Sequence, residues 1–326
     1  MASDPFFLFT RCAIAVLAVG AALAQIGERV TANALRADVS FLASDALEGR
    51  ATPSRGLDIA AEYIAEGFRR AGLEPVGDDG YFQTASFEGA RNVAGVLRGS
   101  DPRLKDTYVV LTAHYDHLGI CGKGDICNGA NDDASGTASV IEIAAALGGL
   151  ATRPRRSVLF LALFGEESGL LGSHYYTGHP IVPLAKTIAD INLEQLGRTD
   201  ETGEGEKLGQ FNLTGFDFTN LAAILRPYGK RAGVKVAIDK ARSDAFFARG
   251  DNAAFAEAGV PSTTLSVTYV FGDYHGPGDK WRKLDYENMA RVDRAIALAV
   301  YGLADGGEEP RWNAHNPRTE AYRRAR

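Results

Sequence analysis

The sequence predicts an α/β fold with a mixed, mainly parallel central sheet flanked by helices. From Asn92 onward, short apolar runs typical of strands recur along the chain, and Gly or Asp bounds them. Longer segments between these runs carry apolar residues at helical spacing. Strands that alternate with helices favour a parallel sheet that is covered on both faces.

The individual elements follow from the same two patterns. Strands are expected at residues 92–99, 108–116, 157–165, 187–197, 209–215, 233–238 and 261–267. Helices are expected at residues 134–150, 218–229, 252–259 and 285–303. In the first of these helices, Val140, Ile143, Ala144 and Leu147 repeat with the spacing of one buried face.

An amphipathic helix is expected within residues 57–73, ahead of the first strand. Ile59, Tyr63, Ile64 and Phe68 are spaced there for one apolar face, so this helix should pack on the same core.

The chain is expected to form one main domain at residues 25–305, because the sequence has no internal repeat and no long low-complexity linker. The polar, arginine-rich segment 306–326 is expected to be a C-terminal surface extension, with Trp312 docking back onto the body.

The first 24 residues are typical of a secretory signal peptide. Arg11 precedes an apolar run at 12–24 that ends in Ala22-Leu23-Ala24 and is too short to span a bilayer comfortably. Because Asp4 offsets Arg11, an uncleaved anchor and a misassigned start stay open as alternatives. A cleaved signal implies a periplasmic or extracellular protein without stable membrane insertion.

Charge and cysteine content narrow the partners and the compartment. A formal net charge of -6 argues against nucleic acid and favours small molecules or peptides. Cys121 and Cys127, in the glycine-rich stretch GICGKGDICNG, are expected to form a disulfide in an exported protein. A thiolate metal site is the alternative, although two lone cysteines make a poor zinc set.

Common catalytic motifs are missing from the sequence. It contains no G-x-S-x-G, no H-E-x-x-H, no G-x-x-x-x-G-K-[ST], and no G-x-G-x-x-G after a strand. What remains is a series of acids and histidines where predicted strands end.

The strand expected at 108–116 runs into the first of these residues. His114 and Asp116 face the same side of a strand, so Asp116 can fix the tautomer of a metal-binding His114. His117, taken alone, is expected to be a surface or hydrogen-bonding histidine.

Further donors lie at later strand and helix ends. Helix capping explains one of the adjacent Asp132 and Asp133, and the other could bridge two cations. Glu166 and Glu167 follow a predicted strand, where a solvated turn is the alternative interpretation. In open α/β sheets, this edge is where ligands bind. The set suited to zinc without a thiolate is His114, Asp132, Glu167, Glu194 and His275.

Five segments of the chain resemble, in order and spacing, the motif blocks of the M28 family of dinuclear zinc aminopeptidases. They are AHYDHLG, NGANDDASGTAS, FGEESGLLGSHYY, NLEQLGR and YHGPGDK. The resemblance covers roughly residues 38–302 and implies a phosphorylase/hydrolase-like fold of the zinc exopeptidase type. The protease-associated insertion of many larger relatives is missing before Asn92.

The same resemblance implies a role for each site residue. Asp132 would bridge two Zn²⁺ ions per chain. His114 and Glu194 would complete the ligands of one ion, and Glu167 and His275 those of the other. Glu166 would be the general base, Asp116 would orient His114, and Asp279 would orient His275.

Two departures from the family pattern affect the details. Glu194 stands where many members have aspartate, so we expect retained metal binding with an altered metal preference. Asn252 stands where the block S-D-H-x-x-F often has histidine, which affects the substrate pocket more than catalysis.

The function implied is hydrolysis of N-terminal peptide bonds by a metal-activated water and a glutamate base, acting on peptides with a free N-terminus. A glutaminyl cyclase-like acyltransferase and a non-catalytic receptor-type domain stay open. The complete donor set and Glu166 favour hydrolysis. Nothing in the sequence indicates the oligomeric state.

Overall fold

The computed structural model describes residues 24–88, 90–203, 205–306 and 308–325. Of the expected signal segment 1–24, all but Ala24 lies outside these ranges. Among the helices within them, none combines the length and the apolar character needed to cross a membrane.

The main sheet has nine strands within the described residues. They are β1 (Glu74–Pro75), β2 (Phe82–Thr84), β3 (Arg91–Leu97), β4 (Tyr108–His114), β7 (Ser157–Leu163), β8 (Thr187–Leu193), β9 (Gln210–Leu213), β10 (Lys235–Ala237) and β11 (Ser262–Ser266). Their order is β1-β3-β7-β4-β8-β11-β9-β10, and β2 pairs with β3.

The centre of the sheet is parallel and its flanks are mixed. β7, β4, β8 and β11 run in one direction, whereas β3 and β9 pair with this centre in the antiparallel sense. In the register, Leu111 of β4 lies between Phe160 of β7 and Ile191 of β8, and all three are fully buried. Such continuous apolar runs are typical of strands covered on both faces, so the predicted fold class is confirmed.

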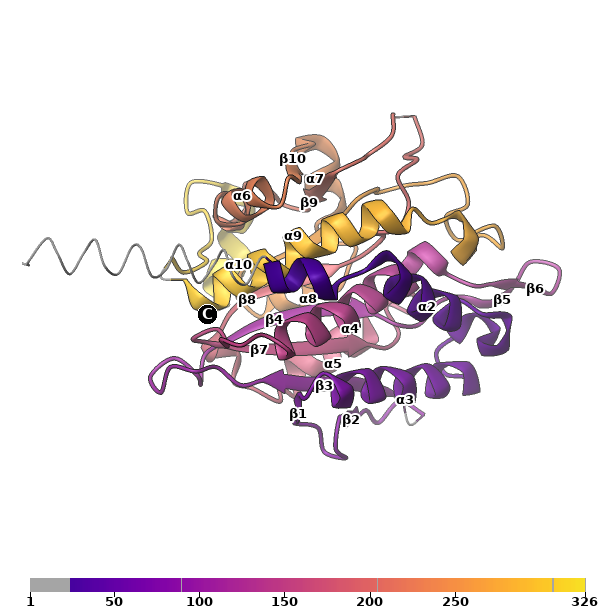
Figure 1. The fold of residues 1–326 in the computed structure, drawn as a ribbon, viewed down its shortest axis with the longest axis horizontal. Helices are drawn as coiled ribbons and strands as arrows, with labels where there is room; N and C mark the ends of the chain where they lie inside the picture. Colours follow the sequence, from indigo (N-terminus) through magenta and orange to yellow (C-terminus); the bar gives the residue numbers. More distant parts are fainter. Residues whose placement is uncertain (1–23, 89, 204, 307, 326) are drawn as a thin grey trace, which may run out of the picture.

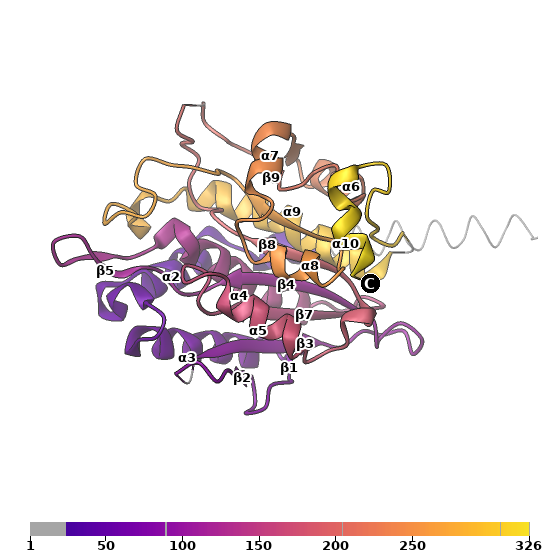
Figure 2. The same cartoon turned by 180° about the vertical axis from the view of Figure 1, so that it is seen from behind.

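Helices cover both faces of this sheet. They are α2 (Ala32–Leu42), α3 (Arg55–Arg70), α4 (Ser135–Gly148), α5 (Leu171–Gly178), α6 (Leu221–Arg231), α7 (Lys240–Phe246), α8 (Asn252–Glu257), α9 (Tyr286–Asp305) and α10 (Glu320–Arg324). α3, α4 and α9 pack on the face that Figure 1 shows, with α2 over α4 and α9, whereas α5 and α8 cover the face seen in Figure 2.

Short elements complete the chain. They are the 3-10 helices η1 (Asp45–Arg50), η3 (Leu184–Lys186), η4 (Trp281–Lys283) and η5 (Pro317–Thr319), the π-turn η2 (Ala130–Ala134), and the hairpin of β5 (Gly119–Cys121) and β6 (Asp125–Cys127). The hairpin carries the Cys121–Cys127 disulfide, so the predicted bond is confirmed and the thiolate metal site is not formed.

The expected amphipathic helix is α3, but one of its predicted core residues is wrong. Ile64 and Phe68 are fully buried, whereas Ile59 is 36% exposed. The buried face also contains Leu57 and Ala60, so its centre is turned away from Ile59.

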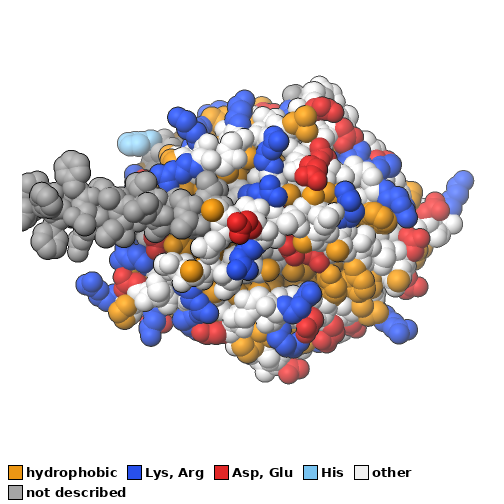
Figure 3. Space-filling model, in the orientation of Figure 1, with side chains coloured by type: hydrophobic (Ala, Val, Ile, Leu, Met, Phe, Trp, Pro, Cys, Tyr) orange, Lys and Arg blue, Asp and Glu red, His pale blue; other side chains and the backbone are white. Residues whose placement is uncertain are grey.

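The end of the chain packs onto the body. Trp312 lies with Phe218, Phe247 and Tyr322 in a small apolar cluster, and its indole N–H donates to the carbonyl of Gly259 at 2.9 Å. The docking predicted for Trp312 is therefore confirmed. On the face shown in Figure 3, basic and acidic side chains are interspersed over the described surface.

Candidate metal centre

The predicted donors gather at the edge of the sheet where the central parallel strands end. His114 is the last residue of β4, Glu194 directly follows β8, and Glu167 follows β7 after a short turn. Because these strands are parallel neighbours, their carboxyl ends meet at one edge. Asp132 reaches this edge from η2, and His275 reaches it from the turn after β11.

One group of donors is formed by His114, Asp132 and Glu194. One ligand atom from each lies within 4.8 Å of the others, a spacing that can hold a metal ion. His114 Nε2 is 3.4 Å from Asp132 Oδ1, and both side chains are buried. These are the three residues that the resemblance implies as ligands of the first ion.

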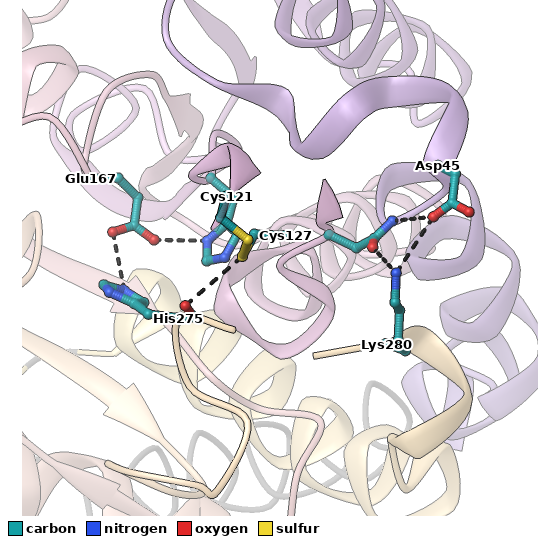
Figure 4. The surroundings of a disulfide bond; sticks show 8 residues. Asp45, Cys121, Cys127, Glu167, His275 and Lys280 are labelled. Atoms are coloured by element: carbon teal, nitrogen blue, oxygen red, sulfur yellow. Dashed lines mark hydrogen bonds and ion pairs between the residues drawn. A yellow bond between two sulfur atoms is a disulfide. The ribbon is translucent and has the colours of Figure 1, made fainter. Parts of the chain in front are cut away.

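A second group lies beside it and shares Asp132. His275 Nε2 is 3.1 Å from Asp132 Oδ2 and 3.1 Å from Glu167 Oε2. His117 approaches the other oxygen of Glu167, with its Nδ1 2.8 Å from Oε1. Figure 4 shows Glu167 between His275 and a second imidazole ring. Ligand atoms of His117, Asp132 and Glu167 also lie within 4.8 Å of one another.

The sequence reasoning missed His117, which we expected to be a surface or hydrogen-bonding residue. In the structure it is 2% exposed. The sequence feature that could have indicated a role at the site is the position of His117, only three residues beyond His114 at the same strand end.

The residues present are suited to binding divalent metal. His114 Nε2, Asp132 Oδ2 and Glu167 Oε1 are buried atoms that have no hydrogen-bond partner among the described residues. Buried polar atoms are normally paired, so these atoms point to a missing partner at the site. Imidazole nitrogens and carboxylate oxygens without a thiolate are ligands that suit zinc.

Burial and crowding raise the pKa of two of the site's acids, Glu194 and Glu166, whereas the neighbouring histidines hold the pKa of Glu167 and Asp132 below their ordinary values. Burial raises the pKa of Glu194 to about 8, and nearby carboxylates add to the effect. Burial likewise raises the pKa of Glu166 well above its ordinary range, with Glu194 and Glu167 contributing. A bound cation would relieve this repulsion, because it favours the charged form of each carboxylate.

Neighbouring carboxylates also raise the pKa of two histidines at the site. Asp132 and Glu167 beside its ring raise the pKa of His275 to about 10. Burial would lower the pKa of His114, but Glu166, Asp116 and Asp132 outweigh it and raise that pKa well above its usual value. The site is therefore strongly attractive to positive charge.

Asp116 contacts both His114 and the Glu166 backbone. His114 Nδ1 lies 3.2 Å from the backbone carbonyl of Asp116 and 3.4 Å from its carboxylate. The same carboxylate accepts the backbone N–H of Glu166 at 3.1 Å. Asp116 thus connects the end of β4 to the turn that carries the adjacent glutamates.

Asp279 has different partners from the one we expected. We predicted that it would orient His275, but its carboxylate accepts the backbone N–H groups of Asn131 and Asp132 at 3.0 and 3.1 Å. Asp279 therefore fixes the backbone of Asp132, the aspartate that both donor groups share, rather than the ring of His275.

The two adjacent aspartates of η2 have separate roles. The carboxylate of Asp133 accepts the backbone N–H of Gly136 at 2.9 Å and that of Gln195 at 3.1 Å. The N-cap of α4 is Ala134, so Asp133 is not the cap that the sequence suggested but does bond the first turn of the helix, while the oxygens of Asp132 face the two donor groups.

Arg50, which the sequence did not single out, ties the surrounding loops together. Its buried guanidinium donates to the carbonyls of Tyr115, Asn128 and Gly129 at 2.7, 2.8 and 3.0 Å. Three carbonyls from the segments before and after the disulfide hairpin thus converge on one side chain. The arrangement fixes the ends of both segments relative to each other.

The disulfide hairpin also touches the late turn. Cys127 Sγ lies 3.8 Å from the backbone carbonyl of His275, and Lys280 contacts Asn128 and Asp45, as Figure 4 shows. The turn that carries His275 is therefore fastened next to the hairpin.

A cavity of about 330 Å³ opens onto the donors. Its lining includes the acids Glu166, Glu167 and Glu194 together with the side chains of Phe246, Arg249, Thr264, Tyr269 and Tyr274.

The structure shows what surrounds Asn252 and Glu194, the two departures from the family pattern. Asn252 is buried behind the cavity wall and accepts the hydroxyl of Thr264 at 2.7 Å. Gly250 makes room for the longer acid, because a Cβ there would lie 2.8 Å from Glu194 Oε2.

Comparison with known sequences agrees with this site. The profile that describes peptidase family M28 matches residues 92–300. Aminopeptidase YwaD of Bacillus subtilis is 25% identical over 232 residues, which are 68% of this chain and 46% of that protein. A protein of Leptosphaeria maculans named "Probable zinc metalloprotease" is 26% identical over 84% of this chain and 73% of its own length. The chain thus spans about half of the first relative and about three quarters of the second.

Solved structures share the architecture. BSAP, a zinc aminopeptidase from Bacillus subtilis, superposes with a TM-score of 0.68 over 85% of this chain and 96% of its own, at 17% identity. At this level of sequence identity, the similarity supports a shared fold and no more.

Proposed function

The chain belongs to peptidase family M28, and on that premise we propose that it is a zinc-dependent aminopeptidase acting on peptides with a free N-terminus. The observation that carries the proposal is the position of Asp132, whose two carboxylate oxygens face two different donor groups. Such sharing suits two cations held side by side, and Glu166 lines the cavity that opens onto these donors.

Two zinc ions at these groups would supply an activated water and polarise the scissile carbonyl. The protein's own contribution is Glu166, which lines the cavity beside Glu167 and is held through its backbone N–H by Asp116. Because burial raises the pKa of Glu166, its carboxylate can take a proton from the attacking water and pass it to the leaving amine.

The acidic lining of the cavity suits the end of a peptide. The carboxylates of Glu166 and Glu194 present negative charge to the positive α-ammonium group of an N-terminal residue. The volume of about 330 Å³, lined in part by Phe246, Tyr269 and Tyr274, leaves room for that residue's side chain. Exopeptidase action follows if the ammonium is bound here.

The proposal is tested with a panel of aminoacyl-anilides, before and after removal of metal with a chelator. We expect hydrolysis that disappears on chelation and returns when zinc is added. A glutaminyl-peptide assayed in parallel tests the cyclase alternative. Cyclisation without anilide hydrolysis would overturn the proposal, and so would the absence of both reactions in the zinc-loaded protein, which would favour a receptor-type domain.

Three further expectations from the sequence remain predictions. They are export of the chain to the periplasm or the extracellular space, the division into a domain at 25–305 with an extension at 306–326, and a content of two zinc ions per chain.

A further inference from the structure

His117 is buried, and its ring makes no oriented hydrogen bond with the described residues, although Nδ1 lies close to Glu167. It is 2% exposed, and neither Nδ1 nor Nε2 has a hydrogen-bond partner among the described residues. Leaving a polar group unpaired in the interior is costly, so a ring in this state points to a partner that binds it.

The ring is held firmly in its position. The backbone N–H of His117 donates to the carbonyl of Arg50 at 3.2 Å. Gly129, with a φ of 57°, lies against the ring so closely that a Cβ there would be 2.4 Å from Cγ of His117. The absence of a side chain at Gly129 is therefore what makes room for this imidazole.

The nitrogen that faces the site is Nδ1. It lies 2.8 Å from Glu167 Oε1, yet that oxygen also has no hydrogen-bond partner among the described residues. The contact is thus close without being an oriented hydrogen bond. Two donor atoms that face the same space in this way can both bind a metal ion that lies between or beside them.

A second imidazole approaches the same carboxylates from another part of the chain. His275 lies 3.1 Å from both Asp132 and Glu167, and its ring stands edge-on to that of His117 with centroids 5.7 Å apart. The group containing His114, by comparison, has one imidazole with the carboxylates of Asp132 and Glu194.

We propose that His117 Nδ1 is a further ligand of the second metal ion, together with Asp132, Glu167 and His275. The inference rests on the two-cation site proposed above. Two nitrogens and two oxygens form a complete protein ligand set for zinc. The second ion is therefore held more tightly than the first and is the later of the two to leave during chelation.

A variant separates ligation from hydrogen bonding. In His117→Asn, the side-chain amide keeps an N–H donor near the place of Nδ1 but offers no nitrogen lone pair to a metal. We expect the dissociation constant of the second zinc to rise by at least about 100-fold, more than the loss of an outer partner usually causes. The control is His174→Asn, which changes an exposed histidine of α5. Zinc binding as tight as in the wild type would overturn the proposal.

A measurement on the wild-type chain keeps the test independent of how the variant folds. With ¹⁵N-labelled histidine, NMR of the zinc-loaded protein should show metal-bound ring nitrogens of His114, His117 and His275. Signals from His114 and His275 alone would overturn the role of His117 and leave the proposed function standing. A chain that takes up no zinc would overturn both.

Discussion

The carboxylate of Asp279 accepts the backbone N–H of Asp132 at 3.1 Å, which ties the late turn to the aspartate shared by both donor groups. Asn131, one residue earlier, donates its backbone N–H to the same carboxylate at 3.0 Å. Because the two oxygens of Asp132 must face two different groups, the position of its backbone decides both distances. Asp279 therefore acts on the site through the backbone of Asp132.

Replacing Asp279 with asparagine should weaken binding of both metals together. The amide keeps only one acceptor oxygen and places its NH2 group against the backbone N–H of Asn131, so η2 should shift. We expect zinc affinity to fall by about 10- to 100-fold, as is usual when an outer partner of a ligand is lost. Competition with a chelator measures it. The control is Asp273→Asn in the same turn, where the carboxylate pairs with Arg198 and Lys283. Equal zinc affinity in the two variants would contradict this role.

Gly250 and Glu194 should behave as a coupled pair. Gly250→Ala places a methyl group 2.8 Å from Glu194 Oε2, so the acid must move and zinc binding at the first group should weaken. Glu194→Asp shortens the acid by one methylene and removes the conflict. In the Glu194→Asp variant, Gly250→Ala should therefore have little effect on zinc affinity.

A double-mutant cycle on zinc affinity checks this coupling. Gly272→Ala is the control, because a Cβ there meets no atom within 4 Å. Additive effects of the Gly250 and Glu194 changes would show that the glycine does not accommodate the longer acid.

Asp293 should make the stability of the chain depend on pH. It is buried on α9, where Ser139 donates to it at 2.9 Å, and burial raises its pKa to about 8. Between about pH 4 and pH 8, the folded chain keeps a proton that the unfolded chain has released. The free energy of unfolding therefore falls as the pH rises through this window.

Asp293→Asn removes this dependence. From pH 6 to pH 8, the wild type should lose about 1 to 3 kcal/mol of unfolding free energy relative to the variant. Urea unfolding at both pH values measures the difference. Glu287→Gln, an exposed change on the same helix, should leave the wild-type slope intact. Parallel pH profiles for wild type and Asp293→Asn would refute the assignment.

Much of the fold followed from local patterns in the sequence. The apolar runs of β4, β7 and β8 and the periodicity of α4 need only neighbouring residues to be recognised, and these elements lie where they were expected. The disulfide followed from the count and spacing of two cysteines. The face of α3 was centred wrongly because Ile59 is apolar but lies beside the buried stripe rather than within it.

The site was only partly predictable, because several of its contacts join distant segments. The five predicted donors stand at the ends of recognisable strands and motif blocks, and the structure brings them together. Arg50, His117 and Gly250 were missed because their positions depend on loops folded against one another. The partner of Asp279 was missed for the same reason, since Asn131 and Asp132 lie about 150 positions earlier in the chain.

The central claim is that Glu166 moves the proton while Glu167 and the other donors hold the metals. Glu166→Gln tests it most directly when the zinc content and the turnover of one preparation are measured together. We predict an unchanged zinc-to-chain ratio and a loss of turnover of at least about 100-fold. A variant that keeps its zinc and more than about a tenth of the wild-type turnover would contradict the account.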